Sequence, residues 1–484
     1  MKKSAREEPL RLPVKIDTTT NGEFWPRPLP PQLQRLKRSA MKAAGENARL
    51  LGVSRRDYLR TTCGAATVFL ALNQLGCVGG RYNVSPESDR DQAAADAALR
   101  GGEFIFDVQT HEVTTDRAWL EIDRPNVGDF LKQVPQARCG GPSWVDCFTE
   151  DVLIREVFLD SDTQYGVLSA LWGEPHPTPI DLAAHTRERV AKLEGNHRLQ
   201  IHGIVQPNSA QSPEEVRERM QALRDEWQIS AWKLYPVWGP DGRGYRLDGG
   251  LGMRTLQQGL DLGVPLFAVH KGLPLPGMDP TYTRPDDVGP AARAFPNATF
   301  LIYHSGFEDG HTEGPYDPNA DRGVDVLIRS LEENGITGDG NVYAELGSTW
   351  HSVMRNPDEA AHTIGKLLKH LGEDRILWGT DCVWYGSPQD QIQAFRAFEI
   401  SPEFQERYGY PALTAERKRK IFGLNAARVY GVNLDELRKA QRTDNVSRAR
   451  AEYANAPSPT FQTYGPRTRR EMLSLLRRSG GRPD

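Results

Sequence analysis

The sequence predicts a (β/α)₈ barrel, an α/β fold in which eight parallel strands alternate with helices. Three observations carry this prediction. Short apolar runs rich in β-branched and aromatic residues occur eight times after residue 103, and longer amphipathic segments separate most of them. Polar residues able to bind metal or move protons stand at the ends of several runs. Alternating strands and helices favour a parallel sheet, and eight such units are typical of a closed barrel.

The predicted strands cover residues 104–109, 165–171, 199–205, 229–235, 265–270, 299–304, 341–346 and 375–380. Helical patterns lie between most of them, at residues 183–195, 212–227, 253–262, 324–334 and 358–372. Ser212 and Glu215 have the spacing of a capping box, and Gly372 stands where a helix would end. The connection over residues 112–160 is too long for a simple crossover. It predicts an insertion over the barrel mouth with its own helix.

The chain is predicted to divide into five parts. They are a long N-terminal region (1–53), an export signal (54–77), a linker (78–102), the barrel (103–432) and a C-terminal extension (433–484). The barrel ends with a closing helix at 414–432, and a basic amphipathic piece, PRTRREMLSLLRRSGG, ends the extension. That piece could dock on the barrel, a second subunit or an anionic membrane, or form a solvated face.

Residues 54–76 resemble a twin-arginine export signal. Arg55 and Arg56 precede a tyrosine, a leucine and a modest apolar segment. The resemblance implies a periplasmic or exported protein, the twin-arginine machinery as a partner, and a membrane anchor if the signal stays uncleaved. The alternative is a chance arginine pair before a core helix. Since 53 residues precede the signal, Met41 is a second candidate start, which would leave the first 40 residues untranslated.

Composition narrows the class of protein. Hydrophobic residues make up 38% of the 484 residues, charged residues 26%, and the formal net charge is -4. These values argue against a disordered chain and against a nucleic-acid partner. The five cysteines form no CxxC pair, so a zinc ribbon or a dense disulfide framework is not expected. Cys139 and Cys147 could bridge a short loop in an oxidising compartment or stay unpaired.

The candidate site residues stand at or just beyond strand ends, which meet at one rim of a parallel barrel. They are Gln109, His111, His270, His304, Glu345 and Asp381. Each alone could be a core or turn residue, but together they predict a site at that rim. Lys233 ends the fourth strand and could carry a carbamate, recognise a substrate carboxylate, or pair with an acidic neighbour. His351, just past the seventh strand, is a further candidate near the rim.

From Phe104 to about Val432 the chain resembles the amidohydrolase superfamily, in its amidohydrolase-related branch. The matching motifs, in order, are DVQTH, AWKLYP, HKG, YHSG, RILWGTD and IFGLNAARVYG. The resemblance implies a divalent metal, zinc or manganese, held by His111, His270 and Asp381. It further implies that His304 acts on a metal-bound water and that Asp381 assists. It leaves Lys233, Glu345 and His351 as candidate substrate contacts.

Gln109 departs from the family pattern, which has histidine there. Its carbonyl oxygen could bind the metal, favouring manganese or magnesium over zinc, or its amide could hydrogen-bond a ligand. The sequence therefore predicts a metal-dependent hydrolase or non-oxidative decarboxylase acting on a small carboxylated or ring-containing compound. The alternative is a catalytically inactive barrel retained for binding after loss of one ligand. The sequence leaves the oligomeric state open, with a homodimer as one alternative.

Overall fold

The computed structural model describes residues 10–75, 78–113, 148–173, 176–194, 198–240, 242–336, 338–442, 444–455, 457 and 459–478. Cys139 and Cys147 lie outside the described residues, as does most of the predicted insertion. The part of the insertion that is described contains α6 (Glu150–Leu153) and a π-helical turn (Ile154–Leu159).

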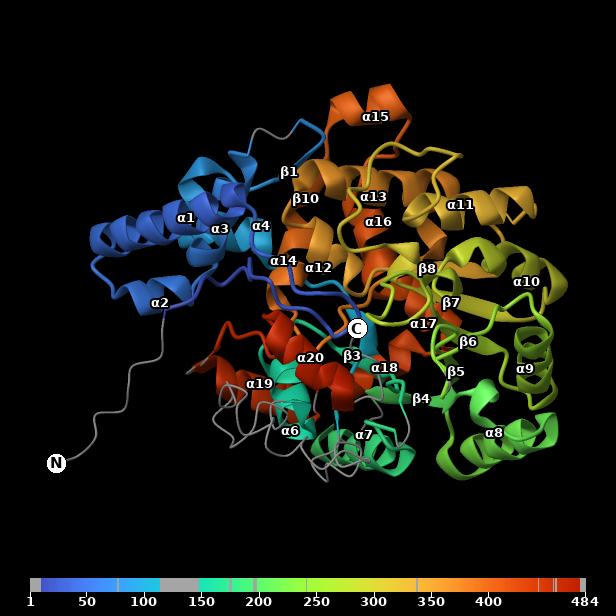
Figure 1. Ribbon diagram of the computed structural model, residues 1–484. Coiled ribbons are helices and arrows are strands. Elements are labelled where there is room, and N and C mark those ends of the chain that lie inside the picture. Colours follow the sequence, from blue (N-terminus) through green and yellow to red (C-terminus); the bar gives the residue numbers. More distant parts are fainter. Residues whose placement is uncertain are drawn as a thin grey trace.

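Eight parallel strands form the barrel at the centre of the fold (Figure 1). They are β2 (Phe106–Thr110), β3 (Tyr165–Leu168), β4 (Leu199–Val205), β5 (Ala231–Leu234), β6 (Leu266–His270), β7 (Thr299–Tyr303), β8 (Val342–Glu345) and β9 (Ile376–Leu377). Neighbours in the sheet follow chain order. The first and last strands meet through Val108 N donating to Trp378 O at 3.1 Å and Asp381 N donating to Gln109 O at 2.9 Å. The predicted (β/α)₈ barrel is confirmed.

Helices surround the strands (Figure 1). They are α7 (Ile180–Glu194), α8 (Pro213–Trp227), α9 (Gly250–Asp261), α10 (Val288–Ala294), α11 (Val324–Glu333), α12 (Thr349–Val353), α13 (Pro357–His370), α14 (Gln389–Ala397) and α15 (Pro402–Tyr408). Ser212 caps α8 by accepting from Glu215 N at 3.2 Å, as its sequence pattern predicts. The closing segment consists of α16 (Ala415–Arg419), a π-helical turn (Lys420–Leu424) and α17 (Asn425–Val429).

The N-terminal part forms a helical unit beside the barrel (Figure 1, blue). It contains α1 (Pro31–Leu50), α2 (Arg55–Leu59), α3 (Thr62–Asn73), β1 (Gly80–Tyr82) and α4 (Gln92–Leu99). The twin-arginine stretch therefore lies in α2 and α3, and α3 is buried along most of its length. The segment expected to be a linker is also folded, because β1 pairs antiparallel with β10 (Phe398–Ile400) and α4 buries Ala95 and Leu99.

Residues 12–24, here called the N-terminal strap, precede this unit and are buried except at positions 17 and 18. Leu12, Val14 and Ile16 belong to the same apolar core as the barrel and its helices. Lys15 forms a buried ion pair with Asp390 at 2.6 Å, which ties the strap to α14.

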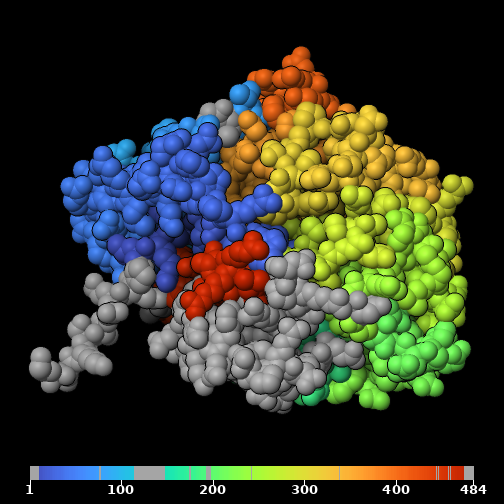
Figure 2. Space-filling view, viewed as in Figure 1, coloured from blue at the N-terminus to red at the C-terminus, as the bar shows by residue number. Residues whose placement is uncertain are grey.

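The C-terminal extension contains α18 (Leu434–Gln441), α19 (Asn445–Asn455) and α20 (Arg469–Arg478). A buried ion pair between Arg198 and Asp444 fixes it to the barrel. Residues 461–472, here called the C-terminal clasp, lie against the strap: Thr20 N donates to Pro466 O at 2.9 Å. Figure 2 shows α20, in red, against the blue N-terminal part, and the Arg469 guanidinium lies over the Trp25 ring at 4.6 Å. Among the described residues, no helix has the length and apolarity that a membrane span requires.

Candidate active site

The predicted site residues lie at the carboxyl ends of the barrel strands, except His351, which lies in α12, and the structure buries all of them. His270 ends β6 and Glu345 ends β8, whereas His304 and Asp381 follow β7 and β9. His304 and Asp381 have φ values of 65° and 59°, a left-handed backbone that side chains other than glycine rarely adopt. Such strain clusters at functional sites, where the surrounding structure holds it in place.

One group of side chains centres on Asp381. His111 Nε2 lies 3.0 Å from Asp381 Oδ1, and its Nδ1 donates to Ser169 O at 2.8 Å. The Gln109 amide donates to Asp381 Oδ1 at 3.2 Å. Asp381 Oδ2 accepts from the Ser348 hydroxyl. Burial opposes ionisation, but the bond from His111 outweighs it and holds the pKa of Asp381 well below its ordinary value.

The Gln109 carbonyl oxygen is buried and has no hydrogen-bond partner among the described residues. Gly347 leaves room for it, because a Cβ at that position would overlap Gln109 Oε1. The nitrogen of Gln109 faces the predicted ligands: it lies 3.3 Å from His111 Nε2 and donates to Asp381. In this geometry Gln109 orients the two side chains as a hydrogen-bond donor.

The substitution Gln109→His tests this arrangement. A histidine at 109, beside His111 and Asp381, would complete a set of two imidazoles and a carboxylate, a common zinc ligand set. We expect elemental analysis to find about one more zinc ion per chain than in the wild type. Gln109→Asn is the control, since it supplies no imidazole and should bind no additional zinc. An unchanged zinc content in Gln109→His would contradict the placement of these three side chains.

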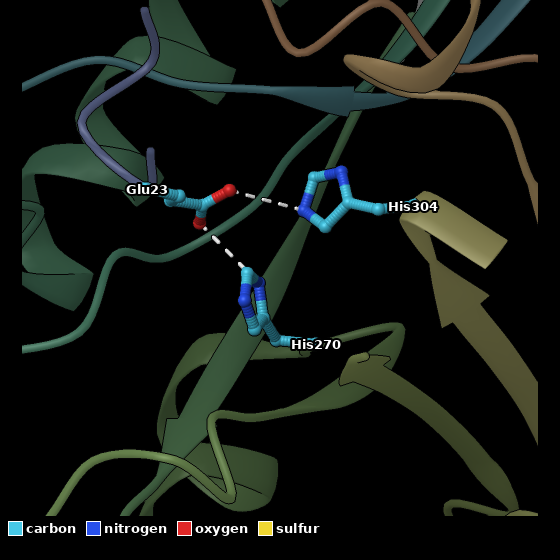
Figure 3. Close-up of side chains that lie close together, drawn as sticks. All are labelled: Glu23, His270 and His304. Carbon is cyan, nitrogen blue, oxygen red and sulfur yellow. Dashed lines mark ion pairs between the residues drawn. The ribbon is translucent and has the colours of Figure 1, made fainter. Parts of the chain in front are cut away.

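A second group joins two predicted histidines to a carboxylate from the N-terminal strap (Figure 3). Glu23 Oε1 lies 3.3 Å from His270 Nδ1, and Glu23 Oε2 lies 3.2 Å from His304 Nε2. All three side chains are buried, and their ligand atoms lie within 4.8 Å of one another. In the described part of the chain this is the group of His, Cys, Asp and Glu residues with metal-ligand spacing. The predicted trio of His111, His270 and Asp381 is not brought together in this way.

The charges within this group are shifted by burial and by the neighbours. Burial lowers the pKa of His270 to about 3, so its ring is neutral at physiological pH. Burial also disfavours a charged His304, but the adjacent Glu23 carboxylate raises the pKa of His304 to about 9. Burial would raise the pKa of Glu23, yet the two imidazoles hold it below its ordinary value. At neutral pH an ionised carboxylate therefore faces a neutral His270 ring and a protonated His304 ring.

Lys233 lies inside the barrel, and its ammonium has no hydrogen-bond partner among the described residues. It lies 3.5 Å from the centroid of the Tyr303 ring and 4.6 Å from that of Tyr235. Burial lowers its pKa to about 7. The ion pair considered as one explanation for this lysine is absent from the described structure. A buried cation without a hydrogen bond is costly, and its place at the site is consistent with binding of an anionic ligand.

Glu345 and His351 support the same rim. Glu345 accepts from His304 N at 3.1 Å and from Gly347 N at 2.7 Å, which fixes the loop after β8 against His304. His351 is buried and stacks on Tyr385 at 3.8 Å between ring centroids, with neither ring nitrogen hydrogen-bonded among the described residues. The Tyr385 hydroxyl is 2.7 Å from the Ser348 hydroxyl, which connects this pair to Asp381.

Two residues of the site, Asn21 and Glu23, were not among the sequence-predicted candidates. Asn21 Nδ2 donates to Asp381 Oδ2 at 2.6 Å, so the strap contacts both groups of side chains. The local signal is the stretch TTTNGEF, in which Asn-Gly is typical of a tight turn. A turn motif does not indicate which site the neighbouring carboxylate reaches. The contact between Asn21 and Asp381 joins residues 360 positions apart in sequence.

Comparison with known protein families identifies the family of this chain. A family model described as "Amidohydrolase" matches residues 177–432, slightly more than half of the chain. No curated protein matches the sequence. Among solved structures, a TIM-barrel protein of Bordetella bronchiseptica, Bb4693, is 16% identical, with coverage of 68% of this chain and 98% of that chain and a TM-score of 0.43.

Two further structures are similar over a comparable length. A 2,6-dihydroxybenzoate decarboxylase from Rhizobium is 13% identical, covering 68% of this chain and 99% of that chain, with a TM-score of 0.38. An amidohydrolase from Burkholderia multivorans, solved with bound zinc, is 14% identical, covering 68% of this chain and 100% of that chain, with a TM-score of 0.38. By the match of the family model over most of its barrel, the chain belongs to the amidohydrolase family.

Proposed function

We propose that this protein is a metal-dependent hydrolase or non-oxidative decarboxylase acting on a small carboxylated or ring-containing compound. One observation carries the proposal. The buried ring nitrogens His270 Nδ1 and His304 Nε2 have no hydrogen-bond partner among the described residues, and both face the same carboxylate. Imidazole nitrogens beside a carboxylate suit a divalent ion such as zinc or manganese. A bound ion supplies a Lewis acid that polarises a substrate oxygen and acidifies water.

The chain's own residues supply binding and proton transfer. The Lys233 ammonium attracts a substrate carboxylate, because it is buried with no hydrogen-bond partner among the described residues. The Nδ1–H group of His111 forms a hydrogen bond with Ser169 O, which orients the ring so that Nε2 faces Asp381 Oδ1. Nε2 is then the atom that holds or releases a proton at the site. In decarboxylation that proton would go to the carbon that loses CO₂, and in hydrolysis to the leaving group. We propose this proton transfer for His111 and Asp381 and metal binding for His270 and His304.

Elemental analysis of the full chain, after expression with added zinc and manganese, tests the proposal. We expect about one ion per wild-type chain and less than about 0.2 in His270→Ala, since the variant lacks one of the imidazoles. A wild-type content below about 0.2 would leave the alternative, an inactive barrel that binds a ligand or partner. With the metal-loaded protein, a panel of aromatic acids, esters and lactones distinguishes the two reactions: decarboxylation releases CO₂, whereas hydrolysis releases an acid with an alcohol or amine.

Export by the twin-arginine machinery, a periplasmic or membrane-anchored location and a homodimer stay predictions from the sequence. The substrate's carboxylate is proposed from Lys233, and its remaining chemistry is the subject of the panel.

A further inference from the structure

The N-terminal strap presents Glu23 to the barrel through a tight turn. Glu23 N donates to Asn21 Oδ1 at 3.0 Å, and Asn21 Nδ2 donates to both Glu23 Oε2, at 2.5 Å, and Asp381 Oδ2, at 2.6 Å. Gly22 lies between them with φ of 95°, a backbone conformation that glycine adopts more readily than other residues. The turn therefore fixes the direction of the Glu23 side chain, which the strap buries between His270 and His304 (Figure 3).

The hydrogen bonds of the two histidines define which nitrogen carries the proton. His270 Nε2 lies 3.0 Å from Leu273 O, and His304 Nδ1 lies 2.7 Å from Gly347 O. Because a carbonyl oxygen only accepts, both of these nitrogens carry hydrogen. The other two nitrogens, His270 Nδ1 and His304 Nε2, face the Glu23 oxygens, and each offers a lone pair to a metal ion once it carries no proton. One proton could satisfy one of these contacts, whereas a divalent cation between the three side chains satisfies both.

Around Asp381, the described residues offer no comparable set of metal ligands. Asp381 Oδ1 accepts from Gln109 and faces His111, and Asp381 Oδ2 accepts from Asn21 and Ser348. These four partners occupy the lone-pair positions of a carboxylate. Asp381 thus lies in a hydrogen-bond network, while the two unpaired imidazole nitrogens, His270 Nδ1 and His304 Nε2, face Glu23.

We infer that Glu23 is the third protein ligand of the metal ion, together with His270 and His304, and that the N-terminal strap is a permanent part of the active site. This inference rests on the proposed metal-dependent function. Where Gln109 supplies no imidazole, a carboxylate from outside the barrel completes a three-ligand set, which leaves coordination positions for water or substrate.

The contacts of the strap support permanence over a removable plug. Asp17 accepts from Thr463 at 2.7 Å, Arg355 donates to Asp17 O at 2.8 Å, and Lys15 pairs with Asp390. Together with the apolar residues of the strap, they hold it against α14, the segment after α12 and the clasp. Cleavage after the apolar segment of residues 62–73 would remove Glu23, so the active protein is expected to keep its N-terminal region.

Metal titration of the full-length chain tests the role of Glu23. Apo-protein is prepared with a chelator, and zinc and manganese binding are measured by calorimetry for the wild type and for Glu23→Gln, which keeps size but removes charge. We expect Glu23→Gln to weaken metal binding by more than about a hundredfold, because even partners outside a ligand set contribute roughly 10- to 100-fold. The absorption spectrum of the cobalt-substituted protein should also change, since a neutral amide replaces the carboxylate beside the metal.

Thr18→Val is the matched control. Thr18 lies in the strap and donates to Arg467 O at 3.3 Å, but it does not contact the metal-ligand group. This variant should bind metal as the wild type does, and circular dichroism of both variants reports folding. If the wild type binds metal and a folded Glu23→Gln variant binds it equally well, the inference is wrong. If that variant also turns over a compound of the substrate panel faster than the wild type does, the strap is an inhibitory plug. A wild type without metal would instead overturn the proposed function.

Discussion

Lys233→Met is expected to stabilise the protein below about pH 9 and to weaken binding of a carboxylated substrate. The lysine ammonium is buried with no hydrogen-bond partner in the described part of the chain, and burial lowers its pKa from 10.5 to about 7. The unfolded chain therefore binds a proton more readily than the folded one between these pH values. Above pH 10.5 the buried lysine is neutral and does not lower the free energy of unfolding. As the pH falls from 10.5 to about 7, the free energy of unfolding decreases, because the unfolded chain takes up the proton first.

The shift corresponds to roughly 4–5 kcal/mol at neutral pH, an order-of-magnitude value. For a chain of this size, scanning calorimetry at pH 6 should show a melting temperature higher by about 4 °C in Lys233→Met. The difference should shrink at pH 9.5. An equal or lower melting temperature in the variant would show that the lysine has a stabilising partner. Substrate affinity should fall in the same variant, because methionine offers no charge to a carboxylate.

Lys366→Met is expected to have the opposite effect on stability. Lys366 is also fully buried, but its ammonium contacts the carboxylates of Glu313 and Asp325. Removal of the cation leaves two buried carboxylates unpaired, and breaking such a group costs about 3–5 kcal/mol. These carboxylates also accept backbone hydrogen bonds from Val324 at 3.0 Å and Asp317 at 3.1 Å, so the loop before α11 should loosen as well.

Chemical denaturation at neutral pH measures the loss. The control is the triple variant Lys366→Met, Glu313→Gln and Asp325→Asn, which removes all three charges and should recover part of the stability. A single variant as stable as the wild type would mean that the triad contributes nothing. The two lysine variants together separate the cost of an unpaired buried cation from the contribution of a paired one.

The barrel could be predicted from sequence because each strand is a local apolar run between turn residues and each helix has its own period. The same logic placed His270, His304 and Asp381 at one rim, since the carboxyl ends of parallel strands meet there. The role of Gln109 was not decidable from sequence. It depends on which end of the amide faces His111, and the structure turns the nitrogen that way.

The N-terminal part was beyond such reasoning for two physical reasons. A short apolar helix buried on all sides has the composition of an export signal, so α3 is ambiguous without its neighbours. Glu23 lies in a polar stretch with no strand or helix period, and its partners, His270 and His304, are distant in sequence. Only tertiary structure brings such a side chain to a site.

The pairing of strap and clasp has a consequence for biosynthesis. The hydrogen bond from Thr463 to Asp17 joins residues 446 positions apart, so it closes almost the whole chain into one loop. The entropy of closing a loop grows with its length, which makes this contact among the last to form. On the ribosome the strap, with Glu23, emerges before residues 461–472 of the clasp. A nascent chain truncated before residue 461 lacks the clasp that holds the strap.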